Sequence, residues 1–164
     1  MRKRILVVDD MPDWRAQLED ILTSDYEVKT VASYDAAMEV IRKREVELVI
    51  VDLRLSPTDE TDRRGVDLLR QLTEYRINAI VLTGYPEHHI QQECEEKYYA
   101  FDFIDKAKIA GNLQLVRDVV REAFSLLESK DKIKSQAIRA AKALQSVAFT
   151  DEISGWPLRK SRKG

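Results

Sequence analysis

The fold of this 164-residue chain is constrained most strongly by three short runs of apolar residues. No polar residue interrupts any of the three runs. They cover residues 5–8, 48–51 and 79–82, and each is rich in β-branched side chains. Continuous apolar runs are typical of strands buried on both faces of a parallel sheet, because a strand with one solvated face alternates polar and apolar residues. Residues 27–32 and 100–104 are two weaker candidates. We therefore expect five strands.

Segments with helical spacing of apolar residues separate these strands. The apolar positions are Trp14, Leu18 and Ile21; Ala37, Val40 and Ile41; and Val66, Leu69 and Leu72. Ser33 is placed to cap the second segment, while Pro86 and Asn112 are placed to begin helices that reach about residues 98 and 127. A β-α order repeated five times predicts an α/β fold, a doubly wound five-stranded parallel sheet with helices on both faces.

Polar residues follow the carboxyl ends of four of the strands, where open parallel sheets place their functional crevice. Asp9 and Asp10 follow the first strand and Asp52 follows the third. Thr83 ends the fourth strand, and Lys106 follows the fifth. If the strand order is 2-1-3-4-5, these four strands are neighbours. Three carboxylates, one hydroxyl and one ammonium would then converge on one edge of the sheet.

This set of groups predicts a cation site with phosphoryl chemistry. Three neighbouring carboxylates repel one another unless a cation lies among them, and oxygen ligands with room for water suit Mg²⁺. Lys106 supplies a positive charge for a phosphoryl oxygen, and Thr83 supplies a hydroxyl donor. Asp52 follows the middle strand of the group, so it is the candidate nucleophile that would form an aspartyl phosphate.

The chain resembles the receiver domain of bacterial response regulators over roughly residues 1–128. The resemblance is carried, in order along the chain, by the acidic pair Asp9-Asp10, by Asp52, by Thr83 followed by Gly84, and by Phe103 and Lys106 in "AFDFIDK". It implies a flavodoxin-like sheet of order 2-1-3-4-5 and a phosphorylation-controlled signalling switch. It also implies a protein of two-component systems. The apolar run near the N-terminus is too short for a signal peptide and ends in two aspartates, so we expect a cytoplasmic protein.

The resemblance implies a role for each site residue. Asp10 and Asp52 would bind Mg²⁺ directly, together with the backbone carbonyl of Arg54, and Asp9 would act through water. Asp52 would accept a phosphoryl group from a sensor histidine kinase or a histidine phosphotransferase. Lys106 would hold a phosphoryl oxygen. The chain's own chemistry would be limited to its phosphorylation and dephosphorylation, so we expect a signalling domain and not a separate enzyme.

The switch implied by the resemblance involves Thr83 and Phe103. Thr83 would hold a phosphoryl oxygen and move toward the phosphate, and Phe103 would turn inward behind it. Such a change is a population shift between two packings that a local charge biases. The output face would lie in residues 86–127, through which a second copy could also bind.

Two features depart from the usual pattern of that family, and two further residues occupy positions that tune its chemistry. Ala107 replaces the proline that usually follows the lysine. The loop after Asp52, "LRLSPTDETDRRG", is long and polar, so we expect it to be exposed beside the site. Arg54 and Tyr85 occupy the positions at which family members tune the lifetime of the phosphate. We expect their long cation and bulky phenol to shield the phosphate.

The C-terminal part differs in charge from the rest. Residues 129–164 carry nine Lys and Arg and three Asp and Glu, whereas the other residues carry 18 and 26. We therefore divide the chain into a receiver domain, 1–128, and a basic, partly helical extension, 129–164. The apolar stripe of the extension is Ile133, Ala137, Ala140, Leu144 and Val147. This stripe could form a coiled-coil dimer or fold back on the protein. The helix that reaches residue 127 could continue into the extension as one long helix, or it could break near residues 128–132.

Other features narrow the alternatives. No apolar run exceeds four residues, so we expect no membrane span. Cys94 is the single cysteine, which excludes an internal disulfide, and the adjacent His88 and His89 point in different directions on a helix. Two alternatives remain. The chain could be a receiver-like module that acts without phosphorylation, or its basic residues 159–164 could contact nucleic acid. A phosphatase is more remote, because Arg54 stands where its second acid would be needed.

Overall fold

The computed structural model describes residues 2–56, 58–98 and 100–153, and it contains a five-stranded parallel sheet. The strands are β1 (Arg4–Val8), β2 (Glu27–Val31), β3 (Leu48–Val51), β4 (Asn78–Thr83) and β5 (Asp102–Asp105). Their order is β2-β1-β3-β4-β5, so the predicted fold class and strand order are confirmed. The fifth strand begins two residues later than predicted, at Asp102, and ends at Asp105.

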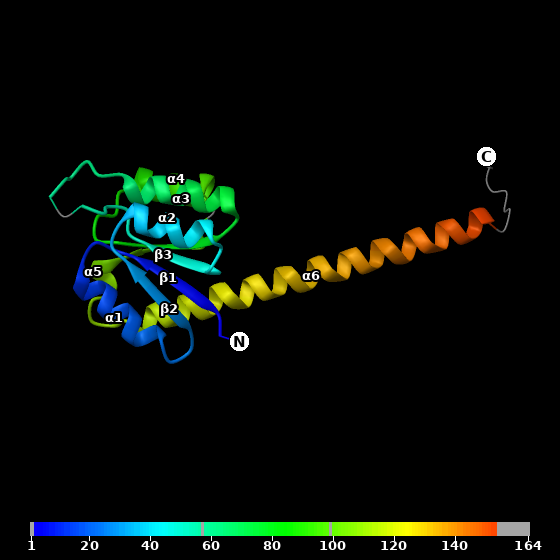
Figure 1. Cartoon of the computed structure of the whole chain (residues 1–164), viewed down its shortest axis with the longest axis horizontal. Helices are drawn as coiled ribbons and strands as arrows, with labels where there is room; N and C mark the ends of the chain where they lie inside the picture. Colours follow the sequence, from blue (N-terminus) through cyan, green and yellow to red (C-terminus); the bar gives the residue numbers. More distant parts are fainter. Residues whose placement is uncertain (1, 57, 99, 154–164) are drawn as a thin grey trace. The chain divides into compact units, whose positions relative to one another are not determined.

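Helices connect the strands and cover both faces of the sheet. They are α1 (Pro12–Leu22), α2 (Tyr34–Arg42), α3 (Arg64–Tyr75), α4 (His88–Lys97), α5 (Lys106–Ile109) and α6 (Gln114–Ile153). Figure 1 shows α2, α3 and α4 on one side of the sheet and α1 and α5 on the other. Ser33 caps α2 as predicted, because its Oγ accepts a hydrogen bond from the Ala36 amide at 3.2 Å. The prediction that Pro86 begins a helix is wrong by two residues, and the short α5 was not predicted.

The strands are apolar on both faces because each face has its own helix layer. Side chains alternate between the two faces along a strand. One set packs in the core cluster with α2, α3 and α4: Leu6, Val8, Val49, Val51, Ala79 and Val81. The alternate set is equally buried: Ile5, Val7, Leu48, Ile50, Ile80 and Leu82. Leu18 and Leu22 are the buried residues of α1, whereas Trp14 and Ile21 are only partly buried.

The chain divides into two compact units, Met1–Val120 and Arg121–Gly164. Helix α6 begins in the first unit, where Val116 and Val120 are buried, and its backbone is helical without a break as far as Ile153. Residues 128–145 are all exposed. The predicted basic end, 159–164, and the side chain of Val147 lie outside the described residues. Within the described part, no helix combines the length and apolar character that a membrane crossing needs.

Gly65 lets α3 approach the backbone that follows β3. Its amide donates a hydrogen bond to the Leu53 carbonyl at 3.1 Å. A Cβ atom at this position would lie 2.0 Å from the carbonyl oxygen of Asp52 and 2.5 Å from the Cα of Leu53. These are backbone atoms, so no side-chain rotation can relieve the overlap. Only glycine fits here without displacing the end of β3.

Gly65→Ala should therefore lower the free energy of unfolding, by about 2–4 kcal/mol, because the backbone at Asp52 must move to admit the methyl group. Urea denaturation of both proteins measures the change. Gly111→Ala is the matched control, since nothing lies within 4 Å of a Cβ at that position, and its effect should stay within about 0.5 kcal/mol. Equal stability of the two variants would contradict the close approach.

Candidate functional site

The four buried polar side chains among the described residues all belong to the carboxyl edge of the sheet. They are Asp9, Asp52, Thr83 and Lys106, with exposed fractions of 2%, 3%, 0% and 6%. Burial of a charged group is unfavourable unless the group is paired and hydrogen-bonded. Because all four lie at one edge of the sheet, this edge is the candidate site. The prediction that these four side chains come together at one edge is confirmed in their positions.

Lys106 joins the ends of β1 and β3. Its Nζ lies 2.6 Å from Asp9 Oδ2 and 2.9 Å from Asp52 Oδ2. Burial disfavours the charged ammonium, but the attraction of Asp52 and the hydrogen bonds to Asp52 and Asp9 outweigh that effect and raise the pKa of Lys106 above its ordinary value. The ammonium is therefore held in its charged form between two carboxylates.

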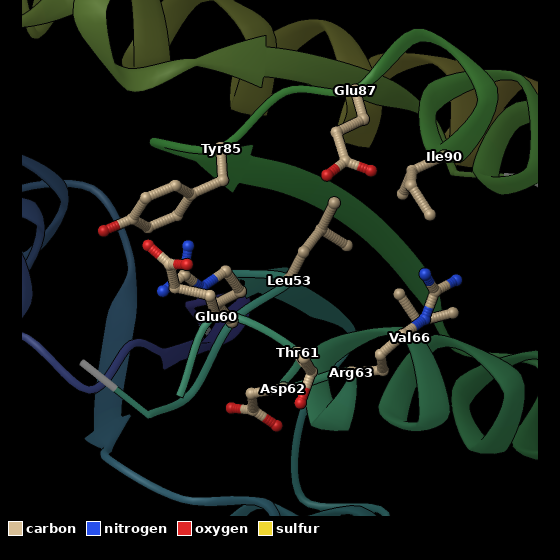
Figure 2. Close-up of a pocket in the computed structure, with 10 residues that line it drawn as sticks. Leu53, Glu60, Thr61, Asp62, Arg63, Val66, Tyr85, Glu87 and Ile90 are labelled. Atoms are coloured by element: carbon tan, nitrogen blue, oxygen red, sulfur yellow. The ribbon is translucent and has the colours of Figure 1, made fainter. Parts of the chain in front are cut away.

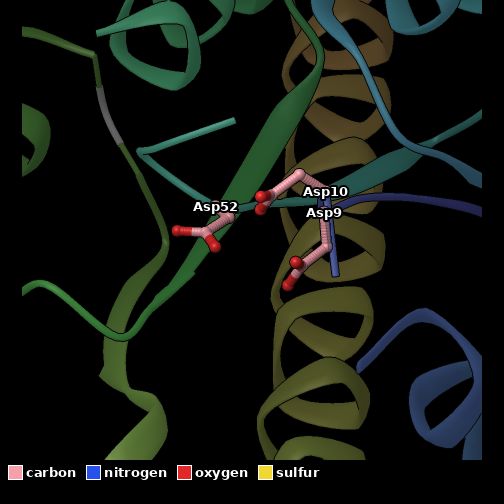
Figure 3. A group of neighbouring side chains, drawn as sticks. All are labelled: Asp9, Asp10 and Asp52. Atoms are coloured by element: carbon pink, nitrogen blue, oxygen red, sulfur yellow. The ribbon is translucent and has the colours of Figure 1, made fainter. Parts of the chain in front are cut away.

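The three carboxylates lie close enough to share one cation. Asp9, Asp10 and Asp52 each offer an oxygen, and these oxygens lie within 4.8 Å of one another, as Figure 3 illustrates. Three carboxylates against one ammonium leave an excess of negative charge. Oxygen donors in this number, with one side open to solvent, fit the preferences of Mg²⁺. The residues present therefore fit the predicted ion.

The two members of the acidic pair have different surroundings. Asp9 is fully engaged, because its Oδ1 accepts a hydrogen bond from the Met11 amide at 2.9 Å and its Oδ2 contacts Lys106. Asp10 is only partly buried, so its carboxylate is accessible to an ion from solvent. Burial raises the pKa of both carboxyl groups, and the negative charge of Asp52 raises that of Asp10 further. Both carboxylates are thus unfavourably placed when no cation is bound.

Thr83 lies at this edge, and Phe103 lies on the neighbouring strand, two residues before that strand ends. Thr83 pairs with Asp105 in the β4–β5 register, directly before Lys106, and its Oγ1 accepts a hydrogen bond from the Tyr85 amide at 3.2 Å. Phe103 is partly buried against the core cluster. It also lines a cavity of about 440 Å³ that extends to Leu115 in the first turn of α6. The structure places both residues near the site without a described contact to Asp52.

Arg54 and Tyr85 stack on each other above the loops that follow β3 and β4. The Arg54 guanidinium carbon lies 3.6 Å from the centre of the Tyr85 ring, a cation–π contact. The Arg54 amide lies 3.4 Å from Asp52 Oδ1, so the stack begins beside the candidate nucleophile. Tyr85 and Arg54 also line a cavity of about 320 Å³, whose wall Figure 2 shows. The predicted pair is thus in direct contact.

The long loop after Asp52 is held by a residue that sequence analysis missed. Asp62 accepts hydrogen bonds from the Leu55 amide at 2.6 Å and from the Arg64 amide at 3.0 Å, so one carboxylate closes the loop and begins α3. Residues 58–61 are exposed as predicted. The prediction is wrong at the ends of the loop, because Leu53 and Gly65 are buried, and residues 54–56 and Asp62 are partly buried. Aspartate side chains commonly accept a hydrogen bond from the backbone two residues further on, so the place of Asp62 two residues before α3 was the available signal.

Trp14 is the second residue whose role was missed. The sequence places it among the apolar positions of the first helix, and in the structure the centre of its ring also lies 5.0 Å from Lys106 Nζ. An indole face attracts an ammonium ion by a cation–π interaction. Trp14 therefore adds a third favourable contact to Lys106. Its helical spacing with Leu18 and Ile21 is the same as that of an ordinary core residue, so the sequence carried no separate signal.

The histidines and the cysteine lie away from this site. His88 and His89 are exposed in the first turn of α4, and the acidic metal-type cluster among the described residues does not include them. Cys94 is fully buried in the core cluster, and burial raises the pKa of its thiol to about 11. It is a packed, unreactive thiol.

Comparison with known proteins agrees with this geometry. The sequence model of the response regulator receiver domain matches residues 5–119. A protein-glutamate methylesterase/protein-glutamine glutaminase of Methanococcus maripaludis is 26% identical over 143 residues, which cover 82% of this chain and 38% of that protein. The chain spans about two fifths of the length of the curated relatives it matches.

Solved structures share the fold. A CheY-like response regulator receiver domain protein from Methanospirillum hungatei has a TM-score of 0.68 at 23% identity, covering 79% of this chain and 99% of that one. The response regulator protein TrrA from Thermotoga maritima, in complex with Mg(2+)-BeF, has a TM-score of 0.59 at 24% identity. That match covers 73% of this chain and 97% of TrrA.

The strain in the acidic pair can be tested by removing one charge. A carboxyl group whose pKa is higher in the folded chain than in the unfolded chain destabilises the fold once it ionises. Asp10→Asn should therefore raise the free energy of unfolding at pH 7 without divalent ions, by less than about 1 kcal/mol because solvent screens a partly exposed carboxylate. The gain should shrink as the pH falls through the raised pKa, and it should vanish below the ordinary value of 3.8.

Thermal unfolding at several pH values, in a chelating buffer, measures this difference. Asp20→Asn, an exposed position of α1 outside the site, is the control. A loss of stability in Asp10→Asn at neutral pH would show that the pair supports the fold and does not strain it.

Proposed function

The chain belongs to the response regulator receiver domain family, the signalling modules of two-component systems, and on this premise we propose that it is a switch controlled by phosphorylation of Asp52. One observation carries the proposal. The Lys106 ammonium is bonded to Asp52 and to Asp9 inside a buried site, with the Asp10 carboxylate within reach of both acids. Asp52 is central to this arrangement, since it takes part in the ammonium contact and in the acidic cluster.

The phosphodonor in this proposal is a phosphohistidine of a sensor histidine kinase or a histidine phosphotransferase. A carboxylate oxygen of Asp52 forms a bond to phosphorus while the bond from phosphorus to the imidazole nitrogen breaks, and the nitrogen keeps the electron pair. Attack by water on phosphorus later returns the carboxylate and inorganic phosphate. The chain's own chemistry would end there, so we extend to it the receiver function and not the esterase or glutaminase activity named for its relatives.

Asp10 and Asp52, with the backbone carbonyl of Arg54, would hold Mg²⁺, and Asp9 would act through water. This division is supported by the contacts of the pair, because Asp9 already accepts hydrogen bonds from Met11 and Lys106, whereas Asp10 is open to solvent. When bound, Mg²⁺ would neutralise negative charge on the acids and on the phosphoryl oxygens. The cytoplasm, where kinase and ion are available, is the proposed location.

Lys106 and Thr83 would hold the phosphoryl oxygens. The Thr83 oxygen accepts a hydrogen bond from the Tyr85 amide, which leaves its hydroxyl hydrogen available for donation. As Thr83 moves to donate it, Phe103 would shift within the space offered by the adjacent cavity of about 440 Å³. The surface of α4 and β5 would change with it. The surface of α4 and β5 would be the face that partner proteins bind.

The central test is phosphorylation by a small phosphodonor. Incubation of the protein with Mg²⁺ and acetyl phosphate should give the mass gain of one phosphoryl group, and Asp52→Asn should abolish it, because the amide is not a nucleophile. Intact-protein mass spectrometry measures the gain. Asp59→Asn, in the exposed loop nearby, is the matched control and should be phosphorylated normally. Absence of any gain with several donors would favour a receiver-like module that acts without phosphorylation.

The stacked pair should set the lifetime of the phosphate. We expect Arg54→Ala and Tyr85→Ala each to shorten the half-life, roughly two- to tenfold, because either change opens the shield that the stack forms over the site. Since the two side chains act as one unit, the double variant should hydrolyse no faster than either single variant. The decay of phosphoprotein after removal of the donor measures the half-life.

The control for this test is Arg70→Ala. Its guanidinium carbon lies 6.0 Å from the ring centre of another tyrosine, Tyr98, and its ion-pair partner is Asp67 of α3, not a carboxylate of the site. That variant should keep the native half-life. Unchanged half-lives in the Arg54 and Tyr85 variants would remove the shielding role.

A further inference from the structure

Helix α6 carries an apolar stripe along its exposed part. Ile133 and Leu144 are 64% and 72% exposed, and Ala137 and Ala140, which lie between them, are exposed as well. Figure 1 shows α6 as one uninterrupted helix through this region. A helix of this kind is only marginally stable in water by itself, because most helical stability in proteins comes from packing of the apolar face. The stripe is therefore a surface that requires a partner.

The spacing of the stripe selects a helix as that partner. The four residues are separated by 4, 3 and 4 positions, the spacing of a heptad seam, in which the apolar side chains stay aligned with a second helix. The seam is narrow, and the basic residues Lys132, Arg139 and Lys142 lie on the opposite side of the helix. A helix that lies on a lipid surface presents instead a broad apolar face of bulky residues. The pattern thus favours helix pairing.

The charges beside the seam favour a second copy of the same chain. The positions that flank the seam are Lys134, Gln136, Ala141 and Ala143. One of these four is charged, so two identical helices can approach without a row of like charges facing each other. Neighbouring helices of different sequence commonly select each other by several opposite charges at these positions, and α6 offers only Lys134 there.

We propose that residues 133–144 of α6 pair with the same residues of a second copy as an antiparallel coiled coil. In this arrangement Ile133 of each chain faces Leu144 of its partner, and Ala137 faces Ala140, so two large layers enclose two small ones. The small layers let the helices approach closely. A parallel pair would bring the two Lys130 side chains together on the seam, where like charges repel. Antiparallel pairing separates them.

The first test is the oligomeric state of the full chain. Analytical ultracentrifugation at micromolar concentrations should give a dimer. Ile133→Lys should raise the dissociation constant of the dimer at least about tenfold, because it places a charge in a large layer of the seam. Ile138→Lys is the matched control: it is the same substitution on the same helix, 48% exposed but away from the seam, and it should leave the constant within about twofold.

A native chain that stays monomeric at the highest concentration would overturn the proposal. So would equal weakening by Ile133→Lys and Ile138→Lys, since the association would then not depend on the seam. Circular dichroism of each variant shows whether the helix remains formed.

The second test determines the direction of the helices. Ile133→Cys and Leu144→Cys chains are mixed and oxidised mildly, and the expected product is a disulfide-linked dimer that contains one chain of each kind. Each variant alone should give no such link, because the two positions are 11 residues, or about 16 Å, apart along a helix. The mixed dimer keeps its other large layer intact. The native chain is the control, since its buried Cys94 is unreactive.

Two results would overturn this arrangement. Disulfide-linked dimers in each variant alone would show a parallel pair. No link in the variants or in their mixture would show that the stripe does not pair with itself.

Discussion

The contact of one ammonium group with two carboxylates, Lys106 with Asp9 and Asp52, is the interaction on which the rest of this site depends. The three residues follow strands that are far apart in sequence, and they can meet only if β1, β3 and β5 end at the same edge. Buried charges of this kind are unfavourable without their partners. The contact therefore requires the parallel arrangement of the strands, and the apolar layers on both faces of the sheet supply the stability that the charged edge does not.

The same edge of the sheet is tightly packed around Asp52, the candidate nucleophile. Gly65 brings α3 onto the backbone of Asp52, and Asp62 holds the beginning of α3 through two backbone amides. Both devices fix the segment that leads from the candidate nucleophile to Arg54. The stack of Arg54 on Tyr85 then connects this segment to the loop after β4, where Thr83 lies. These contacts hold the long loop after β3 in one geometry around Asp52.

Much of this could be predicted from the sequence, for a physical reason. Apolar runs such as residues 5–8 and 48–51 predict strands buried on both faces, and the rules of parallel sheets then bring the residues that follow them to one edge. The remainder depends on contacts that no local pattern encodes. Trp14 has the spacing of a core residue, so its approach to Lys106 was not visible. The fifth strand was placed too early because Ala100 and Phe101 are apolar, although pairing with β4 begins at Asp102.

The charge at the site also explains why an ion belongs to the proposed reaction. Three carboxylates and one ammonium leave a formal excess of two negative charges. Phosphorylation would replace the single charge of the Asp52 carboxylate by the roughly 1.5 to 2 charges of the phosphoryl group, so the excess would grow further. The single ammonium of Lys106 cannot neutralise the charge of the carboxylates and that of the phosphoryl group together, because it already contacts two carboxylates. Burial raises the pKa of Asp9 and of Asp10, which is the response of a site that lacks positive charge. Asp10, on the open side of the site, would hold a divalent cation together with Asp52, and the positive charge of the cation would reduce this deficit so that Lys106 could contact the phosphoryl oxygens.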